Sequence, residues 1–259
     1  MVLILPRAGK YFKTLYKERP KLFWQLFLAN GIQAGLGTFL SMIGIAMTEA
    51  INAGFLVKLA TVTTIFFAWI ILHERISLLK IGAVVSMLSG AYLLTTKGQA
   101  LLPNIGDAYI LGACVCWSLG NILVKKTLLT GSVVADVITL QKPLAGLLVF
   151  LSLLGVSLLK PDWFGGLVQI LGGIRLNIHL LPYALISGLC LGITWIYLYR
   201  TLEVSSASYM TLMSMMTPVI VSLLAILFLG ERLVLPQIIG AGIILISGIL
   251  VAASDIVHP

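Results

Sequence analysis

The sequence predicts an all-α protein, a polytopic membrane helix bundle of about eight transmembrane helices with an inverted internal repeat. The first observation behind this prediction is composition, because 59% of the 259 residues are hydrophobic and only 10% are charged. Soluble domains average about 45–50% apolar and about 25% charged residues, and a soluble fold could not hide so much apolar surface. The other two observations are the length of the apolar runs and a sequence segment that occurs twice in similar form.

The chain begins with a basic segment, residues 1–21, that holds six lysine and arginine residues against one acid. Eight apolar runs follow, each long enough for a helix that crosses a hydrocarbon core of about 30 Å. None shows the alternation of apolar and polar residues that is typical of barrel strands. The connections are short, so no soluble domain is expected. The predicted spans are 22–47, 51–72, 78–96, 108–124, 133–159, 181–199, 207–229 and 236–254.

The repeated segment reads ILHERISLLKIGAVVSMLSG at the end of the second predicted span and in the third. A similar segment, FLGERLVLPQIIGAGIILISG, lies near the C-terminus. The glutamates of the two segments, Glu74 and Glu231, are 157 residues apart, and their closing glycines are 158 residues apart. Five predicted spans, an odd number, lie between the two glutamates, so we expect the two copies on opposite membrane faces. Such an inverted repeat is typical of secondary transporters, in which two similar halves move about a site near the bilayer midplane.

Basic residues are distributed unevenly about the predicted spans, with eleven on the side of the N-terminus and four on the other side. Cytoplasmic loops carry such an excess, so we expect a multi-pass protein of the cell (plasma) membrane with both termini in the cytoplasm. Charges placed in this way argue against nucleic acid as a partner. The expected partners are membrane lipids, including anionic lipids at residues 1–21, and a small-molecule substrate, with a homodimer left open.

Residue patterns for catalysis or for a cofactor are absent from the sequence. Cys114, Cys116 and Cys190 lie inside predicted spans, where cysteine behaves as a small hydrophobic residue, and Cys-Val-Cys has the wrong spacing for structural zinc. The histidines form no HExxH cluster, and neither a Gly-rich phosphate loop nor a GxSxG elbow occurs. We therefore expect no enzyme, no metal and no cofactor.

Three stretches that cover most of the chain carry a family resemblance. Residues 199–252 contain a helix that starts with small residues, a Thr-Pro pair inside a helix and a Gly-Glu-Arg turn. Residues 44–94 contain the first copy of the repeated segment, and residues 107–126 read DAYILGACVCWSLGNILVKK. In this order, the three stretches resemble helices nine and ten, helices three to five, and helix six of the EamA-type permeases of the drug/metabolite transporter superfamily. The resemblance implies a plan of ten helices in two halves of five.

Against that plan the chain has three helices in its first half and five in its second, so it resembles a member that lacks helices one and two. After the basic cytoplasmic segment (1–21), which the charge distribution predicts, the resemblance implies an incomplete first EamA-like repeat (22–97) and a second repeat (98–259), with Met1 to Leu5 as the stub of a cut helix. The expected function is a secondary transporter, a permease or exporter, that moves a small organic metabolite, amino-acid-like or anionic, by alternating access. The alternative is a truncated, transport-inactive membrane protein that acts as a subunit or regulator.

Two lysines lie deep inside predicted spans, where a charge costs roughly 2.5–3.5 kcal/mol and indicates function. Lys58 shares a small, polar helix face with Thr61, and Lys142 precedes Pro143. The alternatives are snorkelling of the ammonium to the headgroups and, for Lys142, pairing with Asp136. No acid lies equally deep, so a pair of lysines that faces the cavity predicts an anionic or zwitterionic ligand.

Further candidates for substrate contacts come from the fourth and seventh spans. Ser214 and Thr217 lie three residues apart, and Pro218 frees a backbone carbonyl near the span centre, as in the broken helices of transporters. The alternative for these polar side chains is contact between helices. Trp117 and Asn121 lie one helical turn apart and are candidates for ligand contact.

Two other features have structural interpretations. Tyr199, at the end of the sixth span, is interpreted as an anchor at the membrane interface. Glu74 and Glu231 lie in tight turns, where a capping or salt-bridge role is favoured over proton coupling.

Overall fold

The computed structural model describes residues 5–131, 133, 135–159, 181–230 and 232–257, and every regular element in these ranges is helical. Within the described residues, eight helical segments are long and apolar enough to cross a membrane, which confirms the predicted fold class and number of spans. They are Pro20–Met47, Ala50–Leu72, Leu78–Thr96, Ile105–Leu128, Ala135–Val156, Leu181–Val204, Ala207–Phe228 and Leu235–Ala253.

Three of these spans depart from continuous α-helix. The first joins α2 (Pro20–Asn30) to α3 (Gly37–Met47) through the π-helical segment η1 (Gly31–Leu36). The second joins α4 (Ala50–Leu56) to α5 (Ala60–Leu72) through the 3₁₀ segment η2 (Val57–Leu59). The seventh breaks between α11 (Ala207–Ser214) and α12 (Thr217–Leu229), next to Pro218. The other spans are formed by α6 (Leu78–Thr96), α7 (Ile105–Leu128), α8 (Ala135–Leu159), α10 (Leu181–Val204) and α13 (Leu235–Val257).

Residues of the predicted basic segment form a helix, α1 (Leu5–Glu18), which the sequence had not predicted. Leu15 is buried, and the ring centroids of Phe12 and Phe23 lie 5.1 Å apart, edge to face, so the apolar side of α1 packs on α2. Lys13 and Lys17 are exposed. The interpretation of Met1 to Leu5 as a helix stub lies outside the described residues, apart from the backbone of Leu5.

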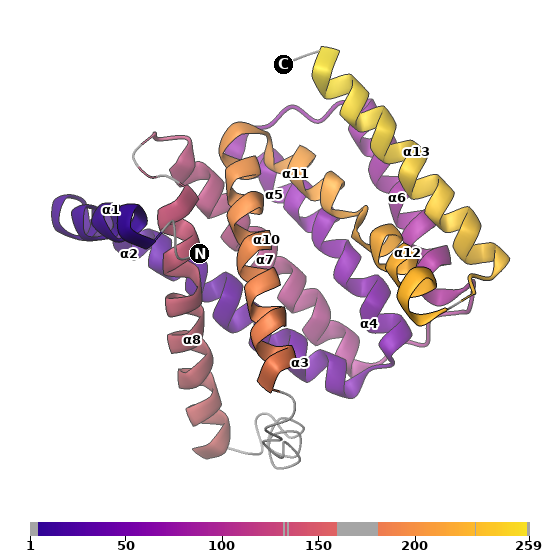
Figure 1. The fold of residues 1–259 in the computed structure, drawn as a ribbon, viewed down its shortest axis with the longest axis horizontal. Helices are drawn as coiled ribbons and strands as arrows, with labels where there is room; N and C mark the ends of the chain where they lie inside the picture. The colour runs from indigo at the N-terminus through magenta and orange to yellow at the C-terminus, as the bar shows by residue number, and fades with distance from the viewer. Residues whose placement is uncertain (1–4, 132, 134, 160–180, 231, 258–259) are drawn as a thin grey trace.

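The bundle is held by close helix pairs and exposes apolar side chains. Figure 1 shows α6 and α13 side by side at one edge of the bundle and α1 at the opposite edge. A Cβ added at Gly90 would lie 2.7 Å from the carbonyl oxygen of Gly240, and one added at Gly248 would lie 3.5 Å from Cε of Met87. These contacts show that α6 and α13 run antiparallel. Large side chains on the outside, such as Phe228 with 80% of its surface exposed, suit a bilayer as solvent.

Three polar contacts join helix ends at one end of the bundle. Lys125 Nζ donates to the carbonyl oxygen of Leu202 over 2.7 Å, near the C-terminus of α10, where a cation is favourable. Arg200 forms an ion pair with Asp136 at the start of α8. Glu74, in the loop after α5, accepts hydrogen bonds at the start of α11. The loops after α5, α7 and α10 therefore lie on the same side of the membrane, as the predicted topology requires.

Glu74 caps α11 from a distant part of the chain. The backbone N–H of Ala207 donates to Oε1 over 2.8 Å, and the N–H and hydroxyl of Ser208 donate to Oε2 over 3.2 and 2.6 Å. A carboxylate at a helix N-terminus satisfies unpaired N–H groups and interacts favourably with the helix dipole. The capping role predicted for Glu74 is confirmed, whereas Glu231 lies outside the described residues.

We expect Glu74→Gln to lower the stability of the purified protein by about 1–2 kcal/mol, because the amide keeps one acceptor oxygen and loses the charge. Thermal unfolding in detergent measures the effect. Glu49→Gln is the matched control, since Glu49 is exposed and makes no side-chain cap at the start of α4. Equal melting temperatures for both variants would contradict a stabilising cap.

Candidate functional site

A cavity of about 340 Å³ lies between η1, α7, α8 and α10. Its volume is at the lower end of the range for small-ligand sites, about 300–1,000 Å³. Aromatic and small residues form most of the wall, and one lysine supplies the charge. The residues that line it are Gln33, Ala34, Thr38, Trp117, Thr139, Lys142, Pro143, Gly188, Leu191, Gly192 and Trp195.

Lys142 differs from the other described residues of the cavity wall because its side chain is ionisable and buried. Only 5% of its surface is exposed, and its Nζ has no hydrogen-bond partner among the described residues. The Nζ lies 2.7 Å from the ring centroid of Trp195 and 5.3 Å from that of Tyr199. A cation over an aromatic face is stabilised, but a buried ammonium without an acceptor retains most of its desolvation penalty. Within the part of the chain that the structure describes, Lys142 therefore has no counter-charge.

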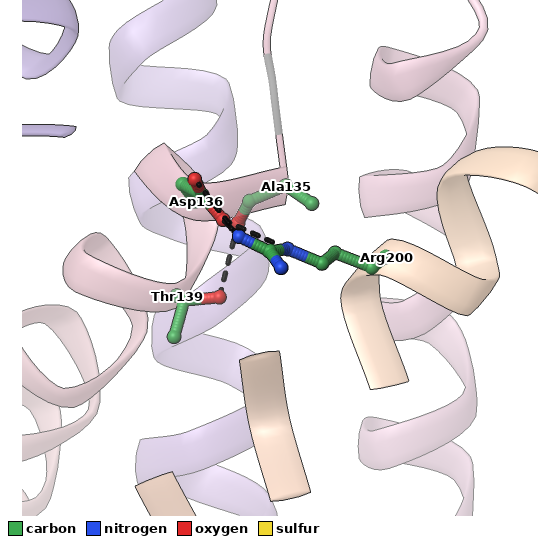
Figure 2. A network of polar contacts seen from close by, with 4 residues as sticks. All are labelled: Ala135, Asp136, Thr139 and Arg200. Atoms are coloured by element: carbon green, nitrogen blue, oxygen red, sulfur yellow. Dashed lines mark hydrogen bonds and ion pairs between the residues drawn. The ribbon is translucent and has the colours of Figure 1, made fainter. Parts of the chain in front are cut away.

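Asp136 does not provide that counter-charge. Its carboxylate accepts hydrogen bonds from the guanidinium of Arg200 at 3.1 to 3.4 Å (Figure 2). In the same view, the hydroxyl of Thr139 donates to the carbonyl oxygen of Ala135 over 3.0 Å, within α8. The alternative in which Asp136 pairs with Lys142 is wrong, because Arg200 of α10 occupies the carboxylate. Snorkelling is also excluded in this conformation, since the ammonium is directed at Trp195 and is buried.

A network of amides and a phenol joins three helices beside the cavity. The side-chain nitrogen of Gln33, in η1, donates to the side-chain oxygen of Asn121 and over 3.5 Å to the carbonyl oxygen of Trp117. The hydroxyl of Tyr199 donates to Oε1 of Gln33 over 3.0 Å. The side-chain amide of Gln33 therefore holds η1, α7 and α10 together around the cavity. Asn121 takes part in this network and does not line the cavity itself, whereas Trp117 does.

Tyr199 corrects one interpretation from the sequence. It is fully buried and stacks on Trp195, with ring centroids 5.8 Å apart, so it is not an interface anchor. Tyr199 lies near the end of an apolar run, which had suggested the membrane interface. In the structure, however, the end of α10 packs into the hydrophobic core, together with the ends of neighbouring helices. Gln33 was missed although a signal existed, a lone glutamine inside the apolar run ANGIQAGLG.

Lys58 and Thr61 lie elsewhere in the bundle. Lys58 is half-buried in η2, Thr61 is buried at the start of α5, and neither lines the cavity that holds Lys142. The structure does not bring the two lysines together as the sequence had led us to expect, because η2 and α8 lie in different parts of the bundle. A role of Lys58 and Thr61 in binding stays a prediction.

The candidates of the seventh span are also separate from this cavity. The hydroxyl of Ser214 donates to the carbonyl oxygen of Met210 over 2.9 Å, and that of Thr217 donates to the carbonyl oxygen of Ser214 over 2.6 Å. Pro218 is the second residue of α12, and the helix break next to it is present as expected. Both hydroxyl groups thus satisfy backbone carbonyls around the break, and contact with a substrate stays a prediction.

A larger hollow, of about 660 Å³, lies along α5, α6 and the loop between them. Exposed apolar side chains such as Trp69, Ile81 and Val85 line it, which is typical of a surface against lipid. Its acid, Glu74, is already bonded to the start of α11. The smaller cavity around Lys142 is therefore the better candidate site.

Comparisons with known proteins agree on the class of the molecule. A family model described as "EamA-like transporter family" matches residues 1–96 and 104–253. An "Uncharacterized transporter" of Clostridium kluyveri is 24% identical over 265 residues, which cover 98% of this chain and 80% of that protein. Another of the same description, from Methanothermobacter thermautotrophicus, is 23% identical and aligns with 87% of this chain and 63% of its own length. A solved crystal structure superposes with a TM-score of 0.71 over 99% of this chain and 88% of that chain, at 14% identity, which shows the fold alone.

Proposed function

Because this chain belongs to the EamA-like transporter family, we propose that it is a secondary transporter that moves a small organic metabolite across the membrane by alternating access. The observation that carries the proposal is Lys142, a buried lysine whose Nζ has no hydrogen-bond partner among the described residues and which lines a ligand-sized cavity between helices. Ionisable residues inside a membrane bundle mark substrate pathways, because burial of a charge is costly unless function requires it. The sequence contains no nucleotide-binding motif, so transport is driven by solute or ion gradients.

Alternating access is supported by the relation between the two halves of the chain. The helices that follow Glu74 and Glu231, α6 and α13, run antiparallel, which is the relation that an inverted repeat requires. The helix interruptions at Lys58 and Met215 are also 157 residues apart, which is the spacing of the two glutamates. Interrupted helices at corresponding positions of two halves are typical of transporters in which one repeat moves against the other. The repeat boundaries, 22–97 and 98–259, belong to this proposal.

An uptake screen with the purified protein in liposomes tests the proposed function. Metabolites are offered with a pH gradient or a Na⁺ gradient imposed separately and without ATP. We expect at least one solute to accumulate under one of the gradients. No flux of any solute through protein shown to be folded and inserted would favour the alternative, a transport-inactive subunit or regulator.

We also propose that both termini and the loop after α7 are cytoplasmic in the plasma membrane, because the loops on that side hold the excess of basic residues. In a chain without its three native cysteines, Thr130→Cys should react with an impermeant maleimide only after permeabilisation of the cell. Ile170→Cys, between the predicted fifth and sixth spans and outside the described residues, should react in intact cells. The reverse pattern would contradict the proposed orientation.

A further inference from the structure

The cavity around Lys142 has the charge of a site for a single anion. Among the described residues that line it, Lys142 is the only ionisable side chain, and Lys58 is not one of them. A ligand with two negative charges would bury one of them without a partner, which is strongly unfavourable. A zwitterion would bring an ammonium group that meets no carboxylate among the described lining residues. The charge of the lining therefore matches one negative charge.

The polar side chains near the ammonium are largely committed to other groups. The hydroxyl of Thr139 donates within α8, and the amide of Gln33 bonds Asn121 and Tyr199. Lys142 Nζ has three N–H donors, and its described neighbour is the face of Trp195, which is a weaker partner than an oxyanion. A carboxylate would accept charge-assisted hydrogen bonds from this group. The other polar groups of the described wall, the hydroxyl of Thr38 and the indole N–H groups of Trp117 and Trp195, carry no charge.

Apolar groups form the rest of the wall. Trp117 and Trp195 offer aromatic surfaces, and Leu191 and Pro143 add aliphatic ones. A Cβ added at Gly188 would have no atom within 4 Å, so this glycine opens on free space. Such surfaces favour one ring or a short hydrocarbon chain, and the volume of about 340 Å³ limits the size of the ligand.

We propose that the substrate is a small organic monocarboxylate with an apolar body, whose carboxylate binds the ammonium of Lys142 and whose body packs against Trp117 and Trp195. The inference rests on the proposed function, since it names the substrate class of the same site. The same chemistry also occurs in membrane fatty acids. The volume of the cavity favours the water-soluble acid, because a long acyl chain would not fit within it.

Binding to the purified protein tests the substrate class without any mutation. Phenylacetate and hexanoate are the monocarboxylate probes, phenylacetamide is the neutral counterpart, phenylalanine is the zwitterion, phenyl phosphate is the dianion and palmitate is the fatty acid. We expect the dissociation constant of phenylacetate, measured by calorimetry, to be at least tenfold lower than that of the amide, the amino acid and the phosphate ester. Equal or tighter binding of any of these three, or binding of palmitate without phenylacetate, would overturn the inference.

Variants of the lysine test the contact itself. Lys142→Met should weaken phenylacetate binding by about 10- to 100-fold and leave phenylacetamide unchanged, whereas Lys142→Arg keeps the charge and should recover part of the affinity. Lys126→Met is the matched control, because Lys126 is exposed on α7, and it should bind like the parent. Unchanged binding by a folded Lys142→Met protein would overturn the inference. If that variant does not fold, the comparison of acid with amide in the parent protein decides.

Failure of this inference differs from failure of the proposed function. Counterflow of a solute that is not a monocarboxylate, blocked when the cavity is filled, would retain the transporter and overturn the substrate class. Monocarboxylate binding that depends on Lys142, without flux of any solute, would support the site and contradict transport.

Discussion

Replacing Gly188 by phenylalanine should abolish solute uptake in liposomes while the protein still folds and inserts. Gly188 lines the Lys142 cavity, and a side chain that begins there enters free space, since no atom lies within 4 Å of an added Cβ. The benzyl group would occupy much of a cavity of about 340 Å³ and exclude the substrate. Uptake of the solute found in the screen, normalised to inserted protein, measures the loss.

Gly155→Phe is the matched control for this experiment. Gly155 lies on α8, is exposed and also has no atom within 4 Å of an added Cβ, but it does not line the cavity. It should transport like the parent. Normal uptake by Gly188→Phe would place the substrate pathway elsewhere, and the interrupted helices at Lys58 and Met215 would become the next candidates.

Replacing Gly240 by leucine should strongly destabilise the bundle. An added Cβ at this position would press on the carbonyl oxygen of Gly90 and lie 2.9 Å from the backbone nitrogen of Leu94, so α6 and α13 would have to separate. Overpacking against backbone costs about 3 kcal/mol or more, which corresponds to a decrease of about 6–12 °C in Tm. Thermal unfolding in detergent measures the change.

Gly242→Leu provides the comparison on the same helix. Gly242 lies two residues further along α13 and has no atom within 4 Å of an added Cβ. Its Tm should remain within a few degrees of that of the parent. A similar decrease for both variants would mean that leucine perturbs α13 itself, and the close contact of α6 with α13 would not explain the loss.

The fold class followed from the sequence because length and apolarity decide which segments can span a bilayer. Every predicted span corresponds to a helical segment, and its bounds shift by a few residues at most ends. Helix α1 was missed because residues 1–21 were interpreted by their charge, while Phe12 and Leu15 carry its apolar side. The π-helical segment η1 was not predicted; in it, Gly31 and Gly35 allow the close approach of Val149 from the distant helix α8, which local periodicity does not encode.

The candidate site was predictable only in part. Depth in the bilayer identified Lys142, because burial of a charge is costly at any position of a bundle. The same argument selected Lys58, and only the tertiary structure separates the two, since spacing along a span does not say which neighbour a side chain faces. Trp195 and Gly188 belong to the cavity through contacts between distant helices, which no local pattern encodes, whereas Gln33 carried a local signal as a lone glutamine inside an apolar run.

Counterflow in proteoliposomes tests the central claim most directly. Vesicles loaded with an unlabelled monocarboxylate are diluted into a trace of the labelled acid, without ATP and without an ion gradient. An alternating-access carrier that uses the Lys142 cavity predicts transient accumulation of label by the parent and by Gly155→Phe, and none by Gly188→Phe or Lys142→Met. Label that only equilibrates, or accumulation that is unchanged in both cavity variants, would contradict the account.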